Sequence, residues 1–133
     1  MRTAVVGVGA IGSVAADSLM AAGHRPLLCV RRHFQALTLE SPHGTTVRDD
    51  FGLAEDPAQV EPHDLVVVAT KAHQTESAWP WLRALTGPES VVLVIQNGVE
   101  HVERVRPLVA EGASVVPAII DVPAQRSAPG TVS

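Results

Sequence analysis

A glycine-rich turn near the start of the chain has the spacing of a phosphate-binding loop. It reads Gly7-Val8-Gly9-Ala10-Ile11-Gly12, a G-x-G-x-x-G pattern. The first glycine permits a tight turn out of a strand, the second lets a pyrophosphate approach the backbone, and the third lets a helix pack closely on the sheet. The free N–H groups and partial positive charge of the helix N-terminus favour a phosphate. We therefore expect these six residues to bind a dinucleotide.

The segments that flank this loop supply the context that the motif requires. The apolar, β-branched run Thr3–Val6 predicts a buried strand, and Leu27–Val30 predicts a second one. Between them, apolar residues at helical spacing predict a helix over Ile11–Ala22, with Gly23 as its C-terminal stop. A glycine-rich turn that binds no ligand could have the same sequence motif. Here, however, strand, loop, helix and strand follow one another in the order of a βαβ unit.

Arg31 stands at the end of the second predicted strand, where the cofactor's ribose would lie. NAD-preferring sites usually place an acidic residue about 20 residues beyond the glycines, to bind the ribose 2′-hydroxyl. This chain has an arginine 19 residues after Gly12. Because a guanidinium pairs well with phosphate oxygens, Arg31 predicts NADP rather than NAD. The alternative is that Arg31 and its neighbour Arg32 are solvated loop residues.

Two further polar residues follow predicted strands. Lys71, the only lysine in the chain, comes just after Leu65–Ala69, and Asn97 comes just after Val91–Ile95. An ammonium there could contact a ribose or a carboxylate, and an amide could both donate and accept hydrogen bonds near a carbonyl group. Taken alone, Lys71 could equally be a solvated charge, and Asn-Gly is a common turn dipeptide.

The rest of the chain continues the alternation of strands and helices. A further strand is predicted at Val115–Ile120, and helices at Val99–Val109 and at Gln74–Leu85, where Pro80 implies a restart or a kink. This pattern predicts an α/β fold, a Rossmann-type doubly wound and mainly parallel sheet, as a single domain over residues 1–133. Ligands of such sheets bind beyond the carboxyl ends of the strands, where the residues named above are expected.

Other segments give weaker signals. We expect one helical turn at Phe34–Leu37, short strands at Thr38–Glu40 and Thr45–Arg48, and a helix start at Asp56-Pro57. The proline- and glycine-containing tail, residues 121–133, is expected to form a hairpin.

Composition narrows the class of protein. The chain has 133 residues, 46% of them apolar, and a net charge of −4, which argues against a nucleic-acid binder. Cys29 is the only cysteine and is expected in the core, and the six histidines lack metal-ligand spacing, so no metal site is expected. The uncharged stretch from Thr3 to Ala16 is too short to span a bilayer. It loosely imitates a secretory signal, but its three glycines at fixed offsets favour a cytoplasmic protein.

These residues together resemble the N-terminal domain of the ketopantoate reductase (2-dehydropantoate 2-reductase) family. The resemblance rests on the glycine loop, the Arg31-Arg32 pair, the stretches 69–74 and 95–99, and the closing residues 128–132. It covers essentially the whole chain, and its most specific elements are the lysine and the Asn-Gly pair at this separation.

The resemblance implies roles for these residues and a reaction. Gly7, Gly9 and Gly12 would bind the pyrophosphate and Arg31 the 2′-phosphate, with Lys71 and Asn97 lying along NADP(H) towards the nicotinamide. The implied reaction is the NADPH-dependent reduction of 2-dehydropantoate, a small 2-oxo acid, to pantoate, in pantothenate and coenzyme A synthesis. Residues near Pro123 and Ala124 would also lie near the cofactor.

The chain departs from the family by ending before its second, mostly helical domain. That domain carries the family's catalytic lysine and substrate-binding residues, so no catalytic residue can be assigned here, and Lys71 does not match that lysine. We therefore expect the chain to bind NADP(H) without reducing ketopantoate on its own. Apolar surface that the second domain would cover could make it a homo-oligomer.

Two alternatives stay open at this point. One is an NADP-dependent paralogue that reduces another 2-oxo or 3-oxo acid. The other is a non-catalytic dinucleotide sensor, such as the regulatory domains of potassium transport systems, which more often carry an acidic residue at the place of Arg31.

Overall fold

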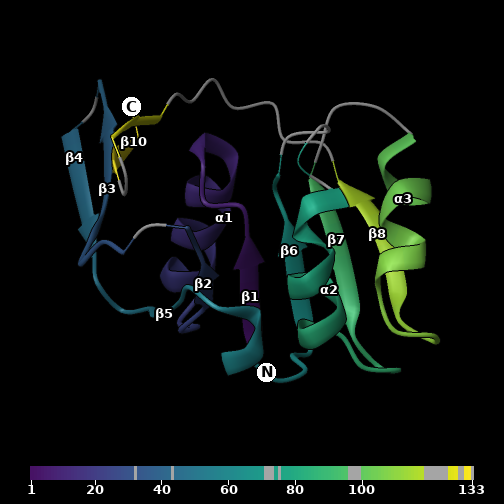
Figure 1. Ribbon diagram of the computed structural model, residues 1–133. Helices are drawn as coiled ribbons and strands as arrows, with labels where there is room; N and C mark the ends of the chain where they lie inside the picture. Colours follow the sequence, from purple (N-terminus) through teal and green to yellow (C-terminus); the bar gives the residue numbers. More distant parts are fainter. Residues whose placement is uncertain are drawn as a thin grey trace.

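Six parallel strands form one sheet in the order β5-β2-β1-β6-β7-β8, as the computed structural model shows (Figure 1). The structure describes residues 1–31, 33–42, 44–70, 74, 76–95, 100–118, 126–128 and 131–132. The strands are β1 (Thr3–Val6), β2 (Leu27–Cys29), β5 (Gly52–Ala54), β6 (Leu65–Val68), β7 (Val91–Ile95) and β8 (Ser114–Ala118). This is the strand order of a doubly wound α/β sheet, so the predicted fold class is confirmed.

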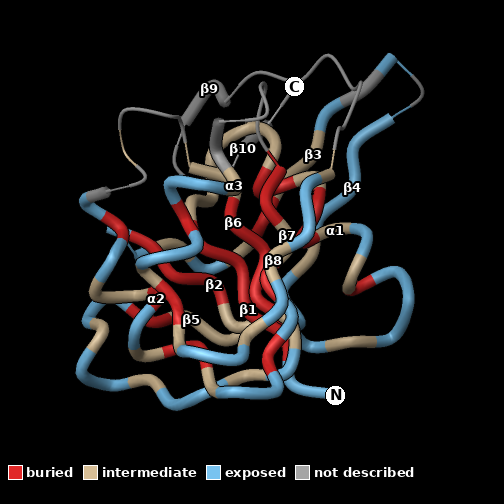
Figure 2. The backbone as a smooth tube through the Cα atoms, turned by 90° about the vertical axis from the view of Figure 1, so that its right-hand side faces the viewer, coloured by how far each residue is buried: buried red, intermediate tan, exposed pale blue. Residues whose placement is uncertain are grey.

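Helices cover both faces of this sheet. They are α1 (Ala10–Ala21), α2 (Trp79–Leu85) and α3 (Glu100–Val105), with 3-10 turns η1 (Pro57–Gln59), η3 (Glu76–Ala78) and η4 (Arg106–Leu108). Side chains alternate along a strand, so β1 sends Val5 into the cluster that includes Met20 of α1, and Ala4 into the cluster that includes Leu82 of α2 and Val105 of α3. The buried strands run through the middle of the molecule (Figure 2).

Helix α1 ends as its sequence predicts. Gly23 has a φ of +91°, a left-handed conformation that a side chain disfavours. The Gly23 N–H donates to the carbonyl of Met20 at 3.0 Å, and the His24 N–H donates to the carbonyl of Leu19 at 3.0 Å. These two bonds satisfy the last helical carbonyls in the Schellman arrangement, which stops the helix and turns the chain into β2.

A second, smaller sheet of order β4-β3-β10-β9 lies beside α1 (Figure 1). Its strands are β3 (Leu37–Ser41), β4 (Gly44–Arg48), β9 (Arg126–Ala128) and β10 (Thr131–Val132). β9 and β10 are antiparallel, which confirms the hairpin predicted for the tail, and β10 pairs in parallel with β3. The sheet is joined to α1 by the fully buried Leu37, which packs in the α1 cluster, and by an ion pair of 2.6 Å from Arg48 to Asp17.

Several local predictions are corrected by the structure. The helical turn expected at Phe34–Leu37 is wrong: the segment is non-helical, with the Phe34 ring 5.6 Å from the ring of Phe51 and Leu37 already in β3. At Pro80 the restart is confirmed, because α2 begins at Trp79 and places the proline in its first turn. Asp56 does begin a helix, its carboxylate accepting from the Ala58 N–H at 2.9 Å, but this helix is the single 3-10 turn η1.

Cys29 lies in the core, as predicted. Its side chain belongs to the cluster between β1, β6 and α2, and the residue is 4% exposed. Burial raises the pKa of the Cys29 thiol to about 12, so at neutral pH it is the protonated, unreactive form. This cysteine therefore acts as a small apolar side chain.

No helix that the structure describes is both long and apolar enough to cross a bilayer. Among the same residues, no group of three histidine, cysteine or acidic side chains is arranged to hold a metal ion.

Two buried threonines have opposite hydrogen-bonding states. Thr86 donates from Oγ1 to the carbonyl of Leu82 at 2.6 Å and accepts from the Ala110 N–H at 2.9 Å. Thr3, at the start of β1, is 3% exposed, and among the described residues its Oγ1 has no hydrogen-bond partner. A buried polar atom without a partner has lost its bonds to water and gained nothing in return.

We expect Thr3→Val to stabilise the protein and Thr86→Val to destabilise it. The first removes an unpaired hydroxyl and should raise the free energy of unfolding by about 1 kcal/mol, whereas the second leaves the Ala110 N–H unpaired and should lower it by about 1–3 kcal/mol. Urea unfolding followed by circular dichroism measures both. Equal destabilisation by the two substitutions would contradict the assignment of Thr3 as unpaired.

Candidate dinucleotide-binding site

The carboxyl ends of β1 and β6 form the switch point of the sheet. The two strands are parallel neighbours, and the Ala69 N–H extends their pairing by donating to the carbonyl of Val6 at 2.9 Å. After β1 the chain crosses to α1 on one face, whereas after β6 it reaches α2 on the other. Connections that leave in opposite directions open a crevice between them, and ligands of doubly wound sheets bind in that crevice.

Gly7 makes the turn from β1 into the loop. Its φ of +88° lies in the region that favours glycine, and a Cβ atom there would come within 2.8 Å of both the backbone N and the Cγ2 of Thr70. The loop is therefore pressed directly against the end of β6. A side chain at this position would have to displace backbone atoms.

Gly12 brings α1 down onto the same turn. A Cβ atom on Gly12 would overlap the carbonyl oxygen of Gly7 and would lie 3.3 Å from the Cβ of Ala69. The helix is thus in contact with the backbone of the turn that precedes it, as expected for the third glycine of the motif.

Gly9 differs from both, because a Cβ atom built on it meets nothing within 4 Å. It is the N-cap of α1, where no side chain of the described residues caps the helix and the first turn contains no acidic residue. The first N–H groups of α1 therefore have no side-chain acceptor among the described residues, and no acidic residue of the first turn offsets the partial positive charge of the helix end. The remaining loop residues, Val8, Ala10 and Ile11, are half-buried. This arrangement fits a phosphate group.

Arg31 lies two residues after Cys29, the last residue of β2, which is the strand next to β1 in the sheet. Its side chain is exposed, and it forms no hydrogen bond or ion pair with the residues that the structure describes. The guanidinium is therefore available to an external anion at the carboxyl edge.

Lys71 and Asn97, together with Arg32, His73, Pro123 and Ala124, lie outside the described residues. The strands before Lys71 and Asn97 are β6 and β7, which are parallel neighbours ending at the same edge as β1. Roles of these residues in binding stay predictions.

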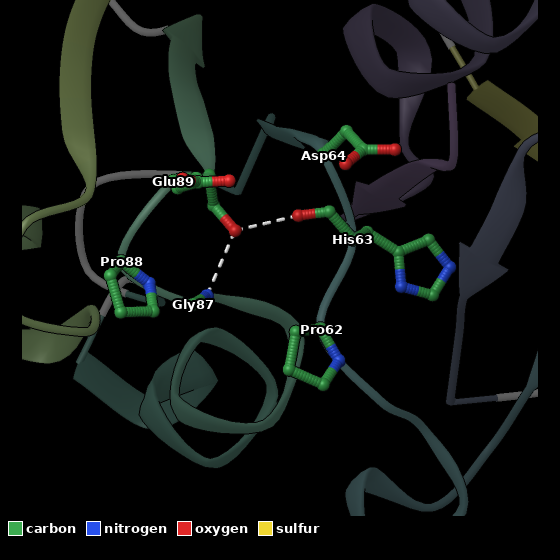
Figure 3. A pocket seen from close by; sticks show the side chains of 7 residues that line it. Pro62, His63, Asp64, Gly87, Pro88 and Glu89 are labelled. Carbon is green, nitrogen blue, oxygen red and sulfur yellow. Dashed lines mark hydrogen bonds between the residues drawn. The ribbon is translucent and has the colours of Figure 1, made fainter.

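A shallow hollow of about 330 Å³ lies at the opposite edge of the sheet (Figure 3). It is lined by Pro62, His63, Asp64, Gly87, Pro88, Glu89 and Ser90, which precede β6 and β7. Its polar groups bind one another: Ser90 Oγ donates to the carbonyl of His63 at 2.6 Å and accepts from the Gly87 N–H at 2.8 Å. The hollow is at the amino ends of the strands, away from the glycine loop.

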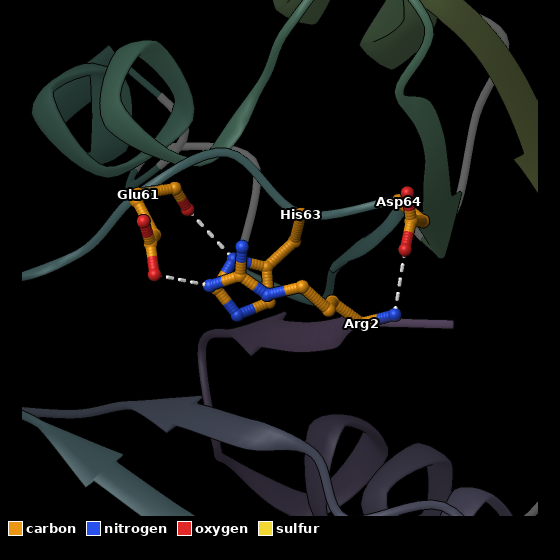
Figure 4. Close-up of polar contacts among 4 residues, drawn as sticks. All are labelled: Arg2, Glu61, His63 and Asp64. Carbon is orange, nitrogen blue, oxygen red and sulfur yellow. Dashed lines mark hydrogen bonds and ion pairs between the residues drawn. The ribbon is translucent and has the colours of Figure 1, made fainter.

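Arg2 forms polar contacts with two acidic residues at the same edge of the sheet (Figure 4). Its backbone N–H donates to Asp64 Oδ2 at 2.7 Å, and its guanidinium pairs with Glu61 Oε1 at 2.5 Å. Because Glu61 and Arg2 are exposed, the ion pair contributes little stability, but it shows that this edge is internally paired. The carboxyl edge with its glycine loop is the better candidate for a ligand site.

Sequence reasoning missed a buried hydroxyl beside the glycine loop. Ser13 lies in the first turns of α1, is 1% exposed, and donates from Oγ to the carbonyl of Gly9 at 2.6 Å. The available signal was a serine four residues after the middle glycine, a spacing at which a helical hydroxyl reaches a backbone carbonyl.

Comparison with known proteins identifies the family. A family model described as "Ketopantoate reductase PanE/ApbA" matches residues 3–133. The chain belongs to the ketopantoate reductase family. Among curated members, the chain is 42% identical over 130 residues to the 2-dehydropantoate 2-reductase of Caulobacter vibrioides and 39% identical over 118 residues to that of Mycobacterium tuberculosis. These alignments cover 96% and 88% of this chain but 43% and 40% of the relatives.

Solved structures of the family have the same fold. The ketopantoate reductase of Ralstonia eutropha superposes with a TM-score of 0.85 at 30% identity, covering 99% of this chain and 45% of that one. The 2-dehydropantoate 2-reductase of Geobacter metallireducens gives 0.86 at 25% identity, with the same coverage. The chain therefore spans less than half the length of these family members. The family match and the shared fold confirm the resemblance inferred from the motifs of the sequence.

The glycine geometry makes a stability prediction that needs no ligand. Gly12→Ala should lower the free energy of unfolding by about 3 kcal/mol or prevent folding, since its Cβ would overlap the Gly7 carbonyl. Gly9→Ala should change it by less than about 1 kcal/mol, because the added methyl enters open space at a φ of −87°. Urea titrations compare the two variants. A Gly9→Ala protein as unstable as Gly12→Ala would contradict the open position of Gly9.

Proposed function

We propose that this chain is the NADPH-binding part of a 2-dehydropantoate 2-reductase. The observation that carries the proposal is the family match over residues 3–133, which includes the complete glycine loop. Members of the family are oxidoreductases that reduce ketopantoate with NADPH. The match favours an oxidoreductase over the dinucleotide sensor that the motifs alone left open.

The residues of the carboxyl edge fit the proposed cofactor. The open space at Gly9 and the uncapped N-terminus of α1 suit the pyrophosphate, whose charge the helix would stabilise. Arg31, exposed at the end of the neighbouring strand, would bind the 2′-phosphate and so select NADP over NAD. Lys71 and Asn97 are proposed to lie further along the cofactor, towards the nicotinamide.

The cofactor, when bound, supplies a hydride to the ketone carbon of a 2-oxo acid. This chain's own residues would bind the nucleotide and orient it at the switch point. Because the chain spans about 43% of its curated relative from Caulobacter vibrioides, we propose that residues 1–133 alone do not reduce ketopantoate.

We propose ketopantoate, a small 2-oxo acid, as the substrate. A paralogous reductase for another oxo acid stays an alternative. The cytoplasmic location and the homo-oligomer both stay predictions. Exposed apolar side chains such as Val91 on β7 and Val116 on β8, 39% and 41% exposed, are surface that self-association could bury.

Replacing Arg31 tests the cofactor preference. Arg31→Ala should weaken NADPH binding about tenfold or more, because a charge-assisted hydrogen bond contributes about 1.5–3 kcal/mol, and should leave NADH binding nearly unchanged. Isothermal titration with both nucleotides at constant salt measures the difference. Arg83→Ala, which removes an exposed arginine from α2 on the other face of the sheet, is the matched control for net charge. Equal losses for the two nucleotides would refute the role of Arg31.

A second experiment tests the division between binding and turnover. The purified 133-residue chain should bind NADPH and yet show no ketopantoate-dependent oxidation of it in a steady-state absorbance assay. The full-length relative from Caulobacter vibrioides serves as the active control. Appreciable turnover by the 133-residue chain would contradict the proposal that this chain alone does not reduce ketopantoate.

A further inference from the structure

We propose that Ser13 is a positioning residue for the cofactor's pyrophosphate, acting through the backbone of Gly9. This inference rests on the proposed function, because it assigns a role within the NADPH site. Ser13 does not itself contact the ligand in this proposal. Its hydroxyl fixes the peptide group whose N–H faces the phosphate.

The contacts of Ser13 converge on a single atom. The carbonyl oxygen of Gly9 accepts from the Ser13 backbone N–H at 3.0 Å and from Ser13 Oγ at 2.6 Å. Ser13 is 1% exposed, so its hydroxyl is shielded from water and the second bond does not compete with solvent. The Gly9 carbonyl thus accepts two hydrogen bonds from one residue, one from its backbone and one from its side chain.

The orientation of this carbonyl determines where the next N–H points. A peptide unit is planar, and its C=O and N–H groups point in opposite directions. Holding the Gly9 carbonyl in the direction of the α1 axis therefore directs the Ala10 N–H out of the helix N-terminus. Two donors on the same carbonyl also polarise the amide, which makes its N–H a better donor to an anion.

This peptide needs such a tether because its own residue restrains it poorly. Gly9 is the N-cap, and no side chain of the described residues caps α1 there. A glycine backbone has the widest conformational freedom of any residue, so without the hydroxyl the Gly9–Ala10 peptide would sample more orientations before binding. Binding would then have to order it, which lowers affinity.

The same helix contains a matched control. Ser18 donates from Oγ to the carbonyl of Val14 at 3.1 Å, with the same four-residue spacing, but it is exposed and its acceptor lies in the middle of α1. Removing either hydroxyl alters the helix in the same chemical way. Only the removal at Ser13 frees a peptide that faces the proposed site.

The test compares Ser13→Ala and Ser18→Ala in binding two ligands, NADPH and adenosine 2′-monophosphate. The second ligand keeps the adenine and the 2′-phosphate but has no pyrophosphate. We expect Ser13→Ala to raise the Kd for NADPH about threefold to tenfold, the range that one net hydrogen bond supplies, with the Kd for adenosine 2′-monophosphate unchanged. Ser18→Ala should change neither Kd. Thermal melting of each variant reports any general loss of structure.

Ser13→Cys separates the hydroxyl from the volume it fills. A thiol occupies the site but is a weak donor, so we expect this variant to bind NADPH like Ser13→Ala rather than like the parent. Full affinity in Ser13→Cys would show that packing alone matters and overturn the inference. Parallel losses for both ligands in Ser13→Ala would also overturn it, since a positioning role concerns only the pyrophosphate.

The inference and the proposed function fail in different ways. If the parent chain binds neither ligand, the NADPH site itself is refuted. If the parent binds NADPH and Ser13→Ala binds it equally well, the site stands and only the role of Ser13 is lost.

Discussion

The close approach of three backbone segments at the end of β1 is the constraint on which the rest of this structure depends. Gly7 lies against Thr70 at the end of β6, and α1 packs on the Gly7 carbonyl through Gly12. Side chains at either position would separate the helix from the sheet. Because Gly7 and Gly12 carry no side chain, α1 begins directly after the turn at the end of β1, and no side chain of the described residues caps its first N–H groups.

The two edges of the sheet differ in how their polar groups are satisfied. At the amino edge, Arg2 binds Glu61 and Asp64, and Ser90 links two neighbouring loops, so this edge is held together by its own contacts. At the carboxyl edge, the described residues leave the start of α1 uncapped and Arg31 unpaired. An anionic ligand requires donors without protein acceptors, and among the described residues the carboxyl edge offers them.

Helix α1 also connects the main sheet to the smaller one. Its inner face packs on β1, while Asp17 pairs with Arg48 of β4 and buried Leu37 joins β3 to the same cluster. The last described strand, β10, returns to pair with β3. The insertion between β2 and β5 and the end of the chain are therefore both tied to the helix that carries the proposed phosphate site.

Much of this protein follows from local patterns. The long apolar runs predict β6 and β7 because only a central parallel strand buries every side chain, and the G-x-G-x-x-G spacing predicts both the turn and the helix packing. Arg31, Lys71 and Asn97 are selected as candidates by the same logic of strand ends, although only Arg31 lies within the described residues.

What the tertiary structure alone decides involves residues whose partners are distant or whose signal is short. The segment that begins at Phe34 is not the expected helical turn, and the Phe34 ring packs against the ring of Phe51. Strand β5 is only three residues long and includes a glycine, so it is recognised as a strand only by its pairing with β2. The burial of the Ser13 hydroxyl and its hydrogen bond to the Gly9 carbonyl become apparent only in the structure, where α1 packs on the glycine loop. Sequence periodicity determines which face of an element is apolar, but the contacts between elements determine which donors stay free, because that depends on atoms brought together by the whole chain.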